Sequence, residues 1–135
     1  MDRLLFGMKE KDVKALYGEP DRQFKDDEKN TIYLYNAQKL RLTFYADEDF
    51  RLGYIITSST DAQLKGSKII GQPWPVLEPA LAGLGLASFE KETFDSADNY
   101  FNEANWVIFQ VEFNEVIRVE LGAAINSKDE FDWKF

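Results

Sequence analysis

The stretch GMKEKDVKALYGEP, residues 7–20, decides how the rest of the chain is arranged. Its apolar residues Val13, Leu16 and Tyr17 have the i, i+3, i+4 spacing of one face of an α-helix. Gly18 tolerates the left-handed backbone found at helix ends, and Pro20 prevents the helix from continuing. The stretch therefore predicts a short amphipathic helix that leads into the segments after it.

A weaker version of this pattern returns at residues 71–85. A proline is tolerated in the first turn of a helix, so Pro79 predicts that the second helix begins near Val76. Gly83 and Gly85 close this helix. Its predicted apolar face consists of Leu77, Leu81 and Leu84.

Each predicted helix precedes about four segments that read as strands. We therefore expect an α+β fold in a single domain, residues 1–135, built from two tandem helix-plus-antiparallel-sheet halves. The halves span about residues 3–60 and 68–122 and form one continuous sheet with the helices on one face. The tail, residues 123–135, alternates aromatic and charged side chains near its end and is expected to dock on the domain.

The strand-like segments alternate apolar and polar residues, which assigns a face to each side chain. The inward face is expected to carry Leu40, Leu42, Phe44, Val107, Phe109, Val111 and Phe113. The two tyrosines of the segment 31–35 are expected on the outward face. A two-residue turn at Asn114 and Glu115 separates the last two strands.

The composition excludes several classes of function. The chain has 135 residues and a net charge of −8, which disfavours nonspecific binding to nucleic acid or anionic membranes. It contains no cysteine and no histidine, so a disulfide framework, a Cys or His metal site and a Ser-His or Cys-His dyad are excluded. Asp47, Glu48 and Asp49 resemble a calcium loop only loosely, because its glycine and distal glutamate are absent. We predict no cofactor, no metal and no catalytic residue.

Some motifs in the chain resemble a known family. The glycine-helix-Gly-x-Pro pattern of residues 6–21 is followed by an aromatic segment, by Leu42-Thr43-Phe44-Tyr45 and by residues 51–55. Together they resemble the beta-lactamase-inhibitory-protein-like fold over most of residues 3–122. The resemblance implies two halves, each a helix-loop element with four antiparallel strands, that form one sheet with a concave binding face. The secreted inhibitor has cysteines in both halves and this chain has none, which fits an intracellular relative such as an immunity protein.

The expected function is therefore non-catalytic protein binding, as an inhibitor or immunity-type protein that uses a concave aromatic and acidic sheet face. Tyrosine, tryptophan and arginine are enriched in binding hot spots. The partner is expected to be another protein, such as a toxin or enzyme, and the acidic charge favours a basic one. The predicted partner-binding residues are Tyr33, Tyr35, Arg41, Tyr45, Tyr54, Trp106, Gln110, Glu112, Arg118 and Glu120.

Other readings stay open at this point. The aromatic rings could form a second core layer beneath the tail, or a face through which the chain forms a homodimer. A small-molecule or enzymatic domain with a pocket between sheet and tail is the alternative function, and Glu112 with Glu120 is its candidate carboxylate pair. The residues before Gly7 lack the apolar core of a signal peptide, and no segment approaches a membrane span, so a cytoplasmic location is expected.

Overall fold

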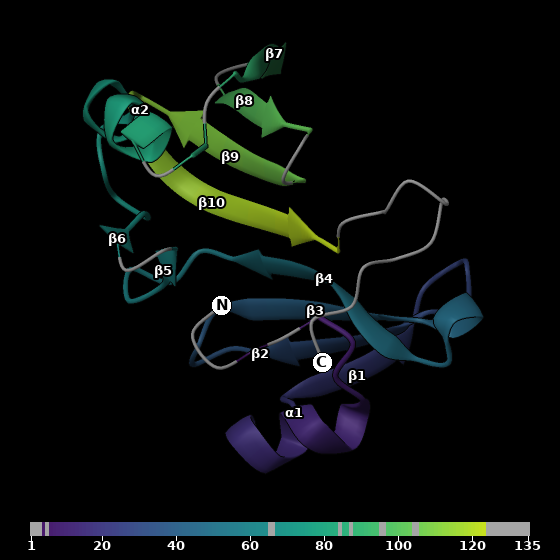
Figure 1. Cartoon of the computed structure of the whole chain (residues 1–135). Helices are drawn as coiled ribbons and strands as arrows, with labels where there is room; N and C mark the ends of the chain where they lie inside the picture. The colour runs from purple at the N-terminus through teal and green to yellow at the C-terminus, as the bar shows by residue number, and fades with distance from the viewer. Residues whose placement is uncertain are drawn as a thin grey trace.

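The computed structural model describes residue 4 and residues 6–64, 67–83, 85–86, 88–94, 97–103 and 106–123. Within this part the chain is a mixed α+β fold, mostly antiparallel sheet, with the helices α1 and α2 (Figure 1). The main sheet has eight strands in the order β1-β2-β3-β4-β10-β9-β8-β7. The predicted α+β class is therefore confirmed, whereas Leu84 and the tail beyond residue 123 lie outside the described residues.

The elements follow one another in two series. The first contains α1 (Glu10–Tyr17), β1 (Arg22–Lys25), β2 (Thr31–Tyr35), β3 (Leu40–Tyr45), a 3-10 turn η1 (Ala46–Glu48) and β4 (Arg51–Thr57). A small hairpin of β5 (Gln63–Leu64) and β6 (Ser67–Lys68) connects it to the second. The second contains α2 (Trp74–Gly83), β7 (Glu90–Phe94), β8 (Ala97–Asn102), β9 (Val107–Glu112) and β10 (Glu115–Gly122). The two series meet where β4 pairs with β10, from Thr57 opposite Val119 to Tyr54 opposite Gly122.

Helix α1 forms where the spacing of its apolar residues predicts it. The backbone N–H of Lys9 donates to the Asp12 carboxylate at 3.0 Å, which satisfies a free donor at the start of the helix. Val13 is fully buried, and Gly18 ends the helix with a φ of 80°. The predicted helix and its stop signal are both confirmed.

Helix α2 begins at Trp74, so the prediction of a start near Val76 is wrong. Pro75 takes the position in the first turn that a proline tolerates, and Pro79 lies in the interior of the helix. The buried side of α2 carries Trp74 together with Leu77 and Leu81. Trp74 stacks on Tyr100 at 4.3 Å between ring centroids, and this packing holds the first turn against the sheet.

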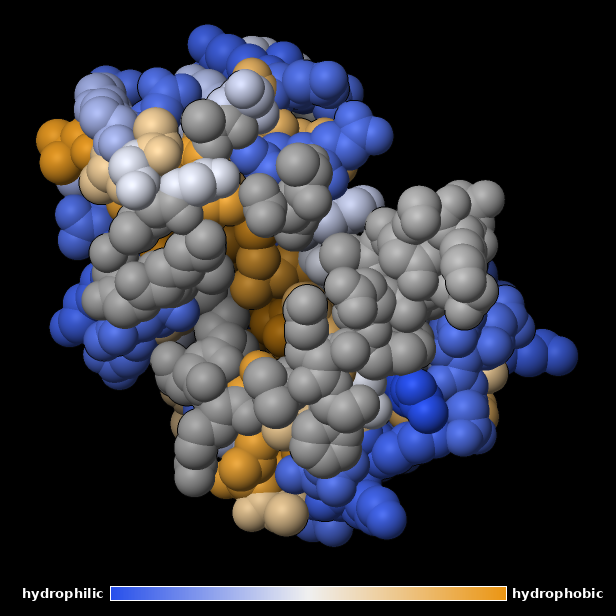
Figure 2. All heavy atoms as spheres, in the orientation of Figure 1, coloured by the Kyte–Doolittle hydropathy of each residue, from blue (hydrophilic) through white to orange (hydrophobic). Residues whose placement is uncertain are grey.

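Most of the core lies on one face of the sheet in two adjoining clusters. Ile32, which pairs with Thr43 on the other face, is also buried, at 1% exposed. One gathers Val13 with Leu42 and Ile55, and the other gathers Leu77 with Val107. Leu42 pairs with Ile55, Ile55 with Leu121, and Leu121 with Val107, and paired residues point to the same side of a sheet. Both helices therefore pack on the same face. Figure 2 shows hydrophobic residues gathered through the middle of the molecule and hydrophilic residues around its margins.

A short backbone clasp precedes each helix. In the first, Gly7 donates to the Leu52 carbonyl at 2.9 Å and Leu52 donates to the Met8 carbonyl at 2.8 Å. In the second, the Gly71 N–H donates to the Val116 carbonyl at 2.7 Å, and Val116 donates to the Gln72 carbonyl at 3.0 Å. Both glycines have positive φ, 95° and 87°, which a residue with a Cβ adopts at a cost. Each clasp ties the start of a helix to the last strand of its own series.

The last hairpin turns at Phe113 and Asn114, one residue earlier than predicted. Both residues have positive φ, as a two-residue type I′ turn requires. Phe113 is 86% exposed at the tip of the hairpin, so its predicted place on the inward face is wrong. Val107, Phe109 and Val111 do lie in the core as expected.

Candidate protein-binding face

The sheet face opposite the two helices carries the candidate site, and we call it the helix-free face. The strand register defines a row across it, because each of its residues pairs with the next. From β2 to β8 the row runs through Leu34, Arg41, Ile56, Glu120, Ile108 and Phe101. In the described part of the chain, both helices pack on the opposite side.

The register brings most of the predicted binding residues together on this face. They come from strands of both series, which meet at the pairing of β4 with β10. The residues that the structure places here are Arg41, Tyr54, Trp106, Gln110, Glu112, Arg118 and Glu120.

Tyr33 and Tyr35 do not belong to the helix-free face, and their predicted placement is wrong. Tyr33 pairs with Leu42 and Tyr35 with Leu40, which puts both rings in the core under α1, where they are 0% and 2% exposed. The Tyr33 hydroxyl donates to Glu10 of α1 at 2.5 Å, and the Tyr35 hydroxyl donates to the Gly18 carbonyl at 2.9 Å. Burial raises the pKa of Tyr35 to about 12. These tyrosines hold the helix on the sheet.

Tyr45 lies beside a bulge at the end of β3. Thr43 pairs with Tyr54 and Phe44 with Leu52, so Gly53 is the extra residue on β4. A Cβ added to Gly53 would lie 2.1 Å from Cε2 of Tyr45, so the tyrosine ring fills the space of the missing side chain. The pKa of Tyr45 is raised above its ordinary value, mainly because the side chain is partly buried. Tyr45 is thus a partly covered ring that packs on its neighbouring strand.

A hydrogen-bonded group crosses the junction between β4 and β10. The Tyr54 hydroxyl donates to Oε1 of Glu120 at 2.6 Å, and Nη2 of Arg118 donates to Oε2 at 3.2 Å. Burial first, and then the hydrogen bond to Glu120, raise the pKa of Tyr54 above its ordinary value of 10. These hydrogen bonds fix the positions of the Tyr54 ring, the Glu120 carboxylate and the Arg118 guanidinium on the helix-free face.

Aromatic rings lie next to this group. Trp106 contacts Tyr54 edge to face at 5.5 Å between centroids and contacts Phe101 at 5.3 Å. Its ring covers Gly122, where an added Cβ would lie 2.8 Å from Cε3 of the indole. Together with Phe101, Ile108, Asn99 and Glu92, Trp106 lines a hollow of about 210 Å³. Phe101 and Asn99 were missed by the sequence reasoning, because residues 97–102 (ADNYFN) do not alternate apolar and polar side chains and so assign no face to them.

A second hollow, of about 330 Å³, lies at the other end of this face. It is lined by the cations Lys39, Arg41 and Arg118 and by the apolar residues Leu34 and Ile56. The helix-free face therefore combines an aromatic hollow, a hydrogen-bonded centre and a cationic hollow.

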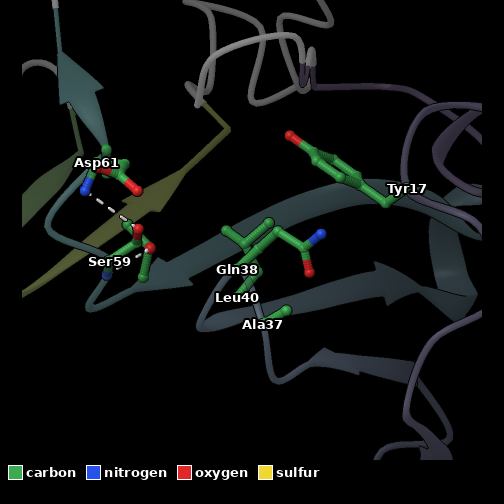
Figure 3. A pocket seen from close by; sticks show the side chains of 8 residues that line it. Tyr17, Ala37, Gln38, Leu40, Ser59 and Asp61 are labelled. Atoms are coloured by element: carbon green, nitrogen blue, oxygen red, sulfur yellow. Dashed lines mark hydrogen bonds between the residues drawn. The ribbon is translucent and has the colours of Figure 1, made fainter.

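A third hollow lies near the end of α1 and measures about 160 Å³. Figure 3 shows Tyr17 on one side of it, Ser59 and Asp61 on the other, and Gln38 and Leu40 between them. The Asp61 N–H donates to the Ser59 hydroxyl at 3.2 Å, so this serine stabilises a turn. Sites for small molecules usually measure roughly 300–1,000 Å³, so this hollow is small for such a ligand.

The candidate carboxylate pair is not brought together. Glu112 pairs with Glu115 at the hairpin, whereas Glu120 pairs with Ile108, four positions along β9 from Glu112. At about 3.3 Å per residue this places the two acids roughly 13 Å apart, beyond the roughly 5–9.5 Å of glycosidase pairs.

Among the described residues no group of three or more Asp or Glu side chains is arranged to hold a metal ion. In the acidic run 47–49, the Asp49 carboxylate accepts a hydrogen bond from Lys9, which lowers the pKa of Asp49.

Comparisons with known proteins give a likeness of fold. No family model and no curated protein matches the sequence. The structure is similar to an extracellular protein containing an SCP domain from Bacillus anthracis, with a TM-score of 0.56 and 14% identity over 86% of this chain and 43% of that one. It is also similar to a cysteine-rich secretory protein from Staphylococcus aureus, with a TM-score of 0.52 and 12% identity over 86% and 42%. A DUF4309 family protein from Bacillus subtilis has a TM-score of 0.48 and 19% identity, over 86% and 78%.

This chain spans less than half the length of the first two proteins. At such identities the likeness shows the fold alone. The helices in the described part of the chain are too short or too polar to cross a membrane.

Proposed function

We propose that this chain is a non-catalytic binding domain that recognises another protein through its helix-free face, in the manner of an inhibitor or immunity protein. The observation that carries the proposal is the concentration of half-buried Trp106, Tyr54 and Arg118 on one sheet face. These residue types supply much of the binding energy in protein interfaces. The two hollows on this face are open to solvent rather than enclosed, which suits a protein partner better than an enclosed small molecule.

The proposal includes an architecture of two tandem halves, about 3–60 and 68–122, as in the beta-lactamase-inhibitory-protein-like fold. The two clasps support it. Gly71, Gln72 and Val116 each lie 64 positions after Gly7, Met8 and Leu52, and the same hydrogen bonds join each set. The strand order supports it as well, because each helix precedes four strands that are consecutive in the main sheet.

A photo-crosslinking experiment tests the proposal. A benzophenone amino acid replaces Gln110 on the helix-free face, and a matched variant carries it at Lys11, which is exposed on α1. We expect the Gln110 variant to form an adduct with one other protein, and the Lys11 variant to form none. The adduct should weaken when Trp106→Ala is added to the Gln110 variant, provided that circular dichroism shows an intact fold.

Two outcomes would contradict the proposal. Equal adducts from both positions would show that the helix-free face has no special role. An adduct between two copies of the chain would favour the homodimer.

A cytoplasmic location is part of the proposal, whereas two structural neighbours are named as extracellular or secretory proteins. The crosslinking is therefore carried out in both cell lysate and culture medium.

A further inference from the structure

We propose that the cationic hollow of the helix-free face binds a carboxylate side chain, Asp or Glu, of the partner protein. This inference rests on the proposed function and adds the chemistry of one contact. It reverses the expectation of a basic partner at this position.

The hollow gathers cations from two distant parts of the sequence, residues 39–41 and Arg118. Arg41 lies on β3, Arg118 on β10 and Lys39 in the turn between β2 and β3, and all three line the same space. Arg41 and Arg118 are on opposite sides of β4, whose Ile56 pairs with Arg41 and lines the floor between them. The three charges therefore converge only in the folded chain.

The local charge opposes the charge of the whole chain. The net charge is −8, with 24 acidic residues, yet none of the described residues that line the hollow is acidic. The local potential, rather than the net charge, decides which group of a partner is attracted at contact distance. A carboxylate that enters the hollow would meet Lys39, Arg41 and the part of the Arg118 guanidinium that Glu120 does not contact.

Arg118 has a hydrogen-bond donor to spare. Its Nη2 donates to Glu120, but its Nε is buried and has no hydrogen-bond partner in the structure. A buried donor without a partner is unfavourable, so a ligand oxygen that reaches Nε would satisfy it. The guanidinium group presents its donors as a fork that matches the two oxygens of a carboxylate.

The apolar part of the lining favours a carboxylate on an aliphatic stem. Leu34 and Ile56 line the hollow beside the cations, so the methylene groups of a Glu or Asp side chain would pack against them. A free inorganic phosphate carries no such group. The position on the helix-free face also places the hollow within the surface proposed to contact the partner.

Nuclear magnetic resonance titration of the full chain tests this inference. The probes are hexaglutamate, inorganic phosphate and sodium chloride at matched ionic strength. We expect saturable shifts with hexaglutamate in the backbone amides around Arg41, in those around Ile56 and in the Arg118 Nε–H. Arg118→Met and Arg41→Met should each weaken the binding of hexaglutamate about tenfold or more, as expected for loss of a charge-assisted hydrogen bond. Lys11→Met on α1 is the matched control and should leave the affinity unchanged.

Three outcomes of these titrations would overturn the inference. Saturable shifts with phosphate but not with hexaglutamate would show a phosphate site. Equal, unsaturated shifts with all three probes would show only screening by salt. If Arg118→Met disturbs the fold, Lys39→Met in the turn provides the second variant. A partner adduct from position 110 without binding of hexaglutamate would refute the carboxylate contact and leave the proposed function standing.

Discussion

The two faces of the sheet use the same pair of side chains for different purposes. On the helix side, Tyr33 donates to Glu10 beneath α1 and is fully buried. On the helix-free face, Tyr54 donates to Glu120, where Arg118 also contacts the acid. The first pair joins a helix to a strand, and the second joins two strands at the junction of the series. The residue types alone therefore do not reveal which tyrosine supports the fold and which one helps to form a surface.

The comparison also separates two kinds of aromatic residue. Phe109 contacts Trp74 and Phe89 in the core and is 0% exposed. Phe101, one strand away on the opposite face, contacts Trp106 and keeps part of its ring exposed. If the helix side holds the fold together and the helix-free face forms a surface, substitutions should act very differently on the two.

Phe109→Ala should give the largest loss of stability, about 3–5 kcal/mol, because it leaves a cavity in a closely packed core. Phe101→Ala is the matched change on the helix-free face and should cost roughly 1 kcal/mol, since it removes a partly exposed ring contact. Urea unfolding followed by far-ultraviolet circular dichroism measures both. Equal losses would remove the distinction between the two faces.

Gly122→Ala should destabilise the chain by about 1–3 kcal/mol, because the added Cβ would overlap the Trp106 ring. The ring must move, so the tryptophan fluorescence spectrum should also change. Gly83→Ala is the control, since an added Cβ at Gly83 meets no atom within 4 Å. An unchanged spectrum for Gly122→Ala would show that Trp106 does not pack on β10.

Tyr33→Phe should cost about 1–2 kcal/mol, because Glu10 loses the hydroxyl that holds α1 on the sheet. Tyr54→Phe should cost less than about 1 kcal/mol, because Glu120 keeps its contact with Arg118. Chemical denaturation of the two variants under the same conditions gives the difference. A larger loss for Tyr54→Phe would mean that the junction of β4 and β10 matters more than the attachment of α1.

Alkaline pH should weaken the fold gradually. Burial raises the pKa of Tyr33, Tyr35 and Tyr54 above the ordinary value of 10, so the unfolded chain loses these protons before the folded chain does. The stabilisation is fully present below pH 10 and is lost as the pH rises, by at most about 1.4 kcal/mol per pH unit for each tyrosine.

Urea midpoints measured from about pH 9 to about pH 11 test this trend across the ordinary tyrosine pKa. The slope should be smaller in Tyr54→Phe, which lacks one of the three groups. A midpoint that stays constant or rises over this range would contradict the assigned burial.

Local patterns predicted those parts of the structure that local chemistry determines. The spacing of Val13, Leu16 and Tyr17 predicts α1, and the alternation along residues 107–112 and 118–121 places Gln110, Arg118 and Glu120 correctly. The alternation fails at the bulge between Val116 and Arg118, where Ile117 is 37% exposed instead of facing inward. For these strands the sequence itself shows which side is apolar.

Other positions depended on register and turn geometry. Four residues connect β2 to β3, which pairs Tyr35 with Leu40 and turns both tyrosines of β2 inward. Because side chains alternate with a period of two, a reading shifted by one residue reverses every side chain of a strand. Phe113 was misplaced for a similar reason, since it occupies a turn position that usually takes Asn, Asp or Gly. The cationic hollow combines residues of the first series with Arg118 of the second, and no local pattern describes it.

The two clasps also bear on the order in which the chain folds. Gly7 and Leu52 are 45 residues apart in sequence, as are Gly71 and Val116, whereas Thr57 and Val119 at the junction are 62 apart. Closing a shorter loop costs less entropy, and local contacts speed folding. We therefore expect each series to close on itself before β4 and β10 pair, so that the helix-free face, including the Tyr54–Glu120 contact, becomes complete only in the last step.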